Sequence, residues 1–80
     1  MKNIRAKWRW TNVYEGYAVT VVFLDESGMY RSVGIGVHNA LHGAVSCAVA
    51  DGAADAGVPA DDFDFLCGII AKQISKEMTS

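Results

Sequence analysis

The stretch that decides the fold is Tyr17-Ala-Val-Thr-Val-Val-Phe-Leu24, followed by the loop Asp25-Glu-Ser-Gly28 and a second apolar segment over residues 29–37. β-Branched and aromatic side chains dominate the first segment, as is typical of a strand. Gly28 can take the left-handed conformation that closes a four-residue hairpin loop. The sequence therefore predicts two antiparallel strands joined by a tight loop.

The returning strand has two unlike faces, because successive side chains of a strand alternate between faces. One face carries Val33, Ile35 and Val37, and the other carries Tyr30, Ser32, Gly34 and Gly36. The glycines leave bare backbone that another element or another chain can approach closely. In a three-stranded meander this strand lies at an edge, where strands of two copies can pair. The predicted homodimer edge is therefore formed by Ser32, Gly34 and Gly36.

Residues 4–10 also alternate with a period of two, which predicts the first strand of the sheet. Trp8 and Trp10 are expected to point toward the core, and the cations Arg5, Lys7 and Arg9 toward solvent. Exposed cations protect a strand edge from pairing, and they can also bind phosphates. The alternative to a protein-binding function is therefore a small nucleic-acid-binding protein that uses Arg5, Lys7 and Arg9. A net charge of −2 and an isoelectric point near 5.5 argue against direct nucleic-acid contact.

Helical spacing replaces this alternation after the third strand. Asn39 is a good N-cap for a helix over residues 39–56, and Gly57 fits the left-handed position that ends a helix. A second helix is predicted from Asp61 or Asp62, because apolar residues then recur every three or four positions. A fourth strand over residues 63–70 is the alternative, since that segment alternates briefly and Gly68 weakens a helix.

These segments predict an α+β fold, in which a three-stranded antiparallel β-sheet packs against two helices in the order β-β-β-α-α. The 80 residues are 51% hydrophobic and 20% charged, which fits a single domain over residues 1–80. The longest apolar run, residues 65–71, is far shorter than the roughly 20 residues of a membrane span. The first ten residues carry four basic side chains and lack the apolar core of a secretory signal. We therefore expect a cytoplasmic protein.

Four side chains could carry chemistry, namely His38, His42, Cys47 and Cys67. The two histidines have the spacing at which a helix presents two imidazoles to one metal ion. No Glu follows His38 as in a zincin motif, and Cys47 falls on another face of the helix. Both cysteines lie in apolar stretches, as is typical of small buried side chains. We therefore expect no metal, no cofactor and no enzymatic activity.

Five acidic residues gather around the predicted turn at Pro59: Asp51, Asp55, Asp61, Asp62 and Asp64. We interpret them as the partner-binding residues, which form one negative patch that engages a basic groove on a protein. The alternative is that they solvate the surface and cap the two helices. Charge reversal of these residues to lysine is expected to weaken partner capture without unfolding the domain.

The hairpin over residues 17–37, together with the Ala-rich helix over residues 39–56, resembles the small phage-encoded anti-CRISPR proteins. The resemblance lies in size and in the strand-strand-helix style, covers about half of the chain and assigns no functional position. It implies an inhibitor in the cytoplasm of the host bacterium that binds a CRISPR-Cas surveillance complex or its nuclease. Such inhibitors are often dimers, and some present acidic residues where nucleic acid would sit.

Overall fold

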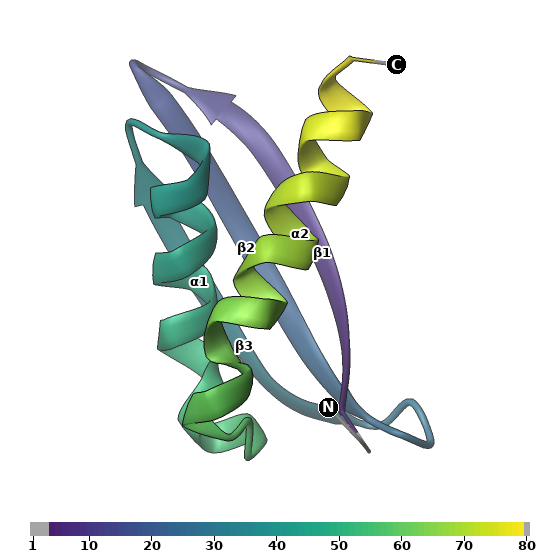
Figure 1. Ribbon diagram of the computed structural model, residues 1–80. Coiled ribbons are helices and arrows are strands. Elements are labelled where there is room, and N and C mark those ends of the chain that lie inside the picture. The colour runs from purple at the N-terminus through teal and green to yellow at the C-terminus, as the bar shows by residue number, and fades with distance from the viewer. Residues whose placement is uncertain (1–3, 80) are drawn as a thin grey trace.

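The structure is a computed structural model that describes residues 4–79, with one antiparallel sheet and two helices on one of its faces (Figure 1). Its elements are β1 (Ile4–Val13), β2 (Gly16–Asp25), β3 (Tyr30–His38), α1 (Leu41–Ala56), the short 3₁₀ helix η1 (Ala60–Asp62) and α2 (Phe63–Met78). The strands follow one another as a meander, so β2 is central and β1 and β3 are the edges. The predicted α+β fold is confirmed, and residues 63–70 belong to a helix rather than a fourth strand.

Asp25 organises the loop between β2 and β3. Its Oδ1 accepts hydrogen bonds from the Ser27 hydroxyl (2.6 Å), the Ser27 N–H (2.9 Å) and the Met29 N–H (2.9 Å). These donors, the Ser27 hydroxyl first, hold the pKa of the Asp25 carboxyl below its usual value. Gly28 has a φ of 92°, so it adopts the expected left-handed conformation.

The core lies between the central strand and the two helices. Val19, Val21 and Phe23 of β2 point toward the helices and are fully buried. The helices cover them with small side chains from α1 and larger ones from α2, among them Ala48, Val49, Leu66, Ile70 and Ile74. Trp8 and Trp10 of β1 are half-buried and pack against this cluster on the same face. The predicted inward orientation of the two tryptophans is therefore confirmed.

The helix α1 lies unusually close to β3, because glycines face it. A Cβ atom at Gly34 would overlap the backbone carbonyl oxygen of Ala48, and one at Gly36 would overlap that of Ala44. Between strand and helix, the buried Ser32 hydroxyl donates a 2.6 Å hydrogen bond to the Gly52 carbonyl. The element that approaches this bare backbone is therefore α1.

A β-bulge separates the two ends of β3. Phe23 pairs with Ser32, whereas Leu24 pairs with Tyr30, so Arg31 is the extra residue. The bulge reverses the alternation, and Tyr30 is 63% exposed while Ser32 is buried. The expectation that Tyr30 and Ser32 share a face is therefore wrong, because a strand alternates regularly only without an inserted residue.

The start of α1 differs from the prediction. The helix begins at Leu41, and its N-cap position is Ala40, which has no side chain able to accept a hydrogen bond. Asn39 is therefore not the N-cap. His38 takes over part of this role, since its Nδ1 accepts a hydrogen bond from the Ala40 N–H (3.0 Å). The C-terminal prediction is confirmed, because Gly57 has a φ of 80° and ends the helix.

Candidate functional site

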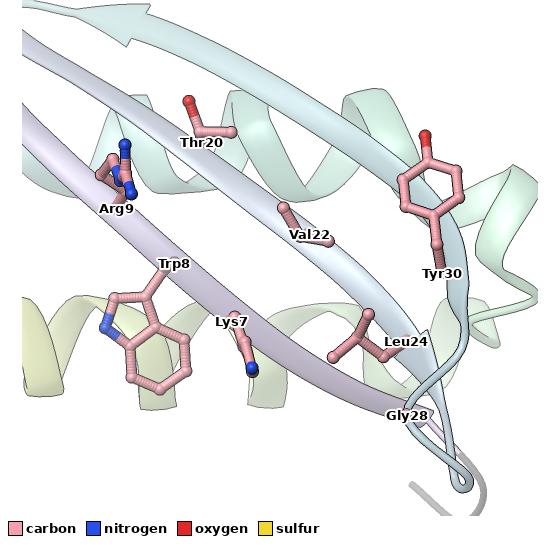
Figure 2. A pocket seen from close by; sticks show the side chains of 8 residues that line it. All are labelled: Lys7, Trp8, Arg9, Thr20, Val22, Leu24, Gly28 and Tyr30. Carbon is pink, nitrogen blue, oxygen red and sulfur yellow. The ribbon is translucent and has the colours of Figure 1, made fainter.

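The candidate site is the face of the sheet that no helix of residues 4–79 covers, which we call the open face (Figures 1 and 2). Strand register aligns its side chains in rows across the sheet, from β1 through β2 to β3. Lys7 lies beside Val22, which lies beside Val33. Arg9 lies beside Thr20, which lies beside Ile35. Each row therefore runs from a cation at one edge to an aliphatic side chain at the other.

The β3 side of the open face is an apolar ridge formed by Val33, Ile35 and Val37. Ile35 is 60% exposed and Val37 is 62% exposed, while Val33 is less exposed. Contiguous exposed apolar patches of this kind often mark the sites at which a protein meets another molecule. The ridge exists because the glycines of β3, rather than its valines, face α1.

The β1 side of the open face is a basic row formed by Arg5, Lys7 and Arg9. All three side chains are exposed, as the sequence predicts. None of the strand positions on the open face within residues 4–79 is acidic, so the basic row has no anionic neighbour on this face. The opposite charge lies on the helical side of the molecule, which carries the five aspartates.

A depression of about 740 Å³ lies between the basic row and β3. Figure 2 shows Lys7 and Arg9 on one side, Tyr30 on the other, and the shorter side chains of Thr20, Val22 and Leu24 between them. We call this depression the central groove, since its floor follows β2. Tyr30 supplies an exposed aromatic ring here only because the bulge at Arg31 turns it to the open face.

Asp51, the first of the predicted partner-binding acids, has a structural role. Its Oδ2 accepts a hydrogen bond from the backbone N–H of Ile35 (3.0 Å), so the helix α1 caps the free edge of β3. In an antiparallel strand the backbone groups of neighbouring residues point to opposite sides, so those of Gly34 and Gly36 point toward β2. The exposed edge is therefore formed by the backbone of Val33, Ile35 and Val37.

The predicted dimer edge at Ser32, Gly34 and Gly36 needs correction for the same reason. These three residues lie under α1, and their backbones face the central strand, so a second chain cannot reach them. Homodimerisation itself stays a prediction, and through this edge it would require displacement of the Asp51 carboxylate.

Replacement of Asp51 by alanine is expected to increase self-association, because it frees an N–H on an otherwise exposed strand edge. Loss of the charge-assisted hydrogen bond is also expected to lower the free energy of unfolding by about 1 kcal/mol. Sedimentation equilibrium and urea denaturation measure the two effects. Asp55→Ala, one helical turn further along, is the matched control and should change neither.

The other four predicted acids lie on the helical side. Asp55, Asp61 and Asp64 are exposed, and Asp62 is half-buried. Within residues 4–79 no three His, Cys, Asp or Glu side chains are grouped closely enough to hold a metal ion. The assignment of these acids to partner binding stays a prediction.

No protein-family profile, curated protein or solved structure matches this chain. None of the helices that the structure describes is long and apolar enough to cross a membrane.

Glu77 is a contact residue that the sequence did not reveal. Its carboxylate accepts hydrogen bonds from both indoles, from Trp10 Nε1 at 2.9 Å and from Trp8 Nε1 at 3.2 Å. These two hydrogen bonds join the last turn of α2 to β1. Both indole N–H groups are therefore engaged by α2, although Trp8 also borders the central groove.

The histidines and cysteines have different surroundings in the structure. The Nδ1 of His38 is engaged with the Ala40 N–H, and His42 is exposed. Burial raises the pKa of the Cys67 thiol, although a hydrogen bond with Ser46 partly opposes this shift. Cys47 is exposed and Cys67 is buried, so only the second of the two expected buried thiols is confirmed.

Proposed function

We propose that the protein is a non-enzymatic protein-binding module that captures its partner through the open face. The observation that carries this proposal is the exposed apolar ridge next to the basic row. A partner that covers Val33, Ile35 and Val37 gains free energy from apolar burial, at about 25 cal/mol for each Å² removed from water. The basic row then selects for a partner with negative charge and orients it.

The ridge favours a protein over a nucleic acid as the partner. Interfaces with nucleic acid are more polar and much more positively charged than those between proteins. Within residues 4–79, the strand positions of the open face carry three cations, and the chain has a net charge of −2. The aliphatic side chains of β3 find better complements in apolar side chains than in phosphates and sugars.

The resemblance to phage-encoded anti-CRISPR proteins supplies a specific form of this proposal. The partner would then be a bacterial CRISPR-Cas surveillance complex or its nuclease, and the protein would be an inhibitor from a phage or mobile element. Asp55, Asp61, Asp62 and Asp64, on the helical side, are the second predicted contact surface.

Affinity capture of the tagged protein from a nuclease-treated bacterial lysate tests the proposal. Wild type is expected to retain a protein partner, and the double variant Ile35→Thr/Val37→Thr to retain at least about tenfold less, because apolar burial is lost while β-branching is kept. Phe65→Gln is the matched control, since Phe65 is equally exposed at 64% but lies on α2. Equal retention by the double variant and wild type would contradict binding through the open face.

Nucleic-acid binding is a second candidate, because the basic row and Tyr30 border the same groove. If it holds, labelled 20-nucleotide probes should bind with an affinity that falls as salt rises. Three phosphate contacts predict a slope of about −2 to −3 in a plot of log K against log salt concentration. Replacement of Arg5, Lys7 and Arg9 by Gln should abolish that slope. A response that is flat in wild type eliminates this candidate.

A further inference from the structure

We infer that the partner segment on the open face is an amphipathic α-helix with acidic residues along one flank, seated in the central groove. This inference rests on the proposed protein-binding function and specifies the partner element. Three observations carry it: the shape of the groove, the separation of the basic row from the apolar ridge, and the lack of acidic residues at the open-face positions of the three strands.

The part of the open face between the basic row and the apolar ridge has the width of a helix. The basic row on β1 and the apolar ridge on β3 are two strand spacings apart, which is about 9.6 Å. A helix with its side chains is about 10–12 Å across. Between the basic row and the apolar ridge lie the shorter side chains Thr20 and Val22 of β2, which also line the central groove (Figure 2). A helix along β2 would add a third layer to the sheet, opposite α1 and α2.

The charges have the spacing of a helix flank. Successive cations of the basic row are two residues apart on a strand, or about 6.8 Å. Residues four apart in a helix are separated by about 6 Å along its axis. Acidic residues repeated every four positions would therefore face Arg5, Lys7 and Arg9 in turn. Apolar residues on the neighbouring flank would contact Val33, Ile35 and Val37.

A second copy of this chain is a poor occupant of the same face. A two-fold axis across the strands would place the basic row opposite its own copy. A two-fold axis along the strands would place each basic row on the apolar ridge of the other copy. Both arrangements desolvate cations with no anion opposite them, because none of the open-face positions of β1, β2 and β3, as described over residues 4–79, is acidic. Charge complementarity therefore requires a different molecule.

Selection from a displayed library of random 20-residue peptides on the wild-type protein tests the inference. We expect enriched peptides to repeat Asp or Glu every three or four positions beside a similar repeat of Leu or Ile. A labelled copy of the most enriched peptide should lose at least about tenfold in affinity when Lys7→Glu/Arg9→Glu is introduced. Lys72→Glu, an exposed cation on α2, is the matched control and should leave the affinity unchanged.

Other outcomes separate the inference from the proposed function. If acidic and apolar residues alternate with a period of two in the enriched peptides, the partner segment is a strand. That result would overturn the inferred helix but would agree with a protein partner. The selection could also enrich no peptide while the Ile35→Thr/Val37→Thr variant still retains less of the captured protein. That result would overturn the helical partner segment and leave the proposed protein-binding function in place. Two further results would show another occupant on the open face and overturn the inference. One is that the 20-nucleotide probe binds and displaces the peptide. The other is that the wild-type protein forms a dimer that Ile35→Thr dissociates.

Discussion

Replacement of Gly34 by alanine is expected to lower the free energy of unfolding by about 3 kcal/mol. The added Cβ would overlap the carbonyl oxygen of Ala48, which belongs to a helix backbone and cannot move as a flexible side chain can. The helix α1 would have to shift away from β3, and this shift would open the buried layer beneath it. Folded domains have about 0.05–0.15 kcal/mol of stability per residue, so this loss is a large share of the total for 80 residues.

Thermal unfolding followed by circular dichroism measures the effect of Gly34→Ala. We expect the Tm to fall by on the order of 15 °C, given roughly 4–8 °C for each kcal/mol in a domain of this size. Gly68→Ala is the matched control. Gly68 lies on the helix α2, and a Cβ atom added there would have open space around it. That control should gain about 0.5–1 kcal/mol from helix propensity. An unchanged Tm for Gly34→Ala would contradict the close approach of α1 to β3.

Reversal of the basic row has the largest expected effect on partner binding. The triple variant Arg5→Glu/Lys7→Glu/Arg9→Glu should reduce partner capture by about 100-fold or more at low salt, because each contact changes from attraction to repulsion. The three side chains are exposed, so the folded state should persist. Partner capture by the triple Gln variant should lie between that of wild type and that of the triple Glu variant, since Gln removes attraction without adding repulsion.

Capture at two salt concentrations checks this second expectation. The difference between wild type and the triple Glu variant should shrink as salt rises, since screening weakens exposed charges. Lys72→Glu changes the net charge by the same amount per residue on the helical side, so it distinguishes a local effect from a global one. Equal capture by the triple Glu variant and wild type at low salt would exclude the basic row from the interface.

The hairpin and the order of elements could be predicted because their signals are local. The loop at Asp25 and Gly28 is encoded within four residues, and its geometry is formed by the loop's own hydrogen bonds. The sequence of the second helix, α2, carries two competing signals. Apolar and polar residues alternate briefly at its start, whereas apolar residues recur every three or four positions over its whole length, and the longer pattern favours the helix. The basic row followed directly from the alternation of β1.

The open face itself could not be read from the sequence. Alternation divides β3 into two faces but does not say which of them meets a helix, and that choice depends on how closely α1 approaches. The bulge at Arg31 depends on pairing with β2, so a single strand does not reveal it. Glu77 lies 67 residues from Trp10 along the chain, and only the folded arrangement brings them together.

The carboxylate that joins the two indoles also gives the molecule a built-in optical reporter. The chain has only two tryptophans, and both indole N–H groups are bonded to a carboxylate of α2, although Trp8 also borders the central groove. Their emission should therefore change when α2 separates from β1. Unfolding can thus be followed in an unlabelled sample, which shows whether a variant that loses its partner is still folded.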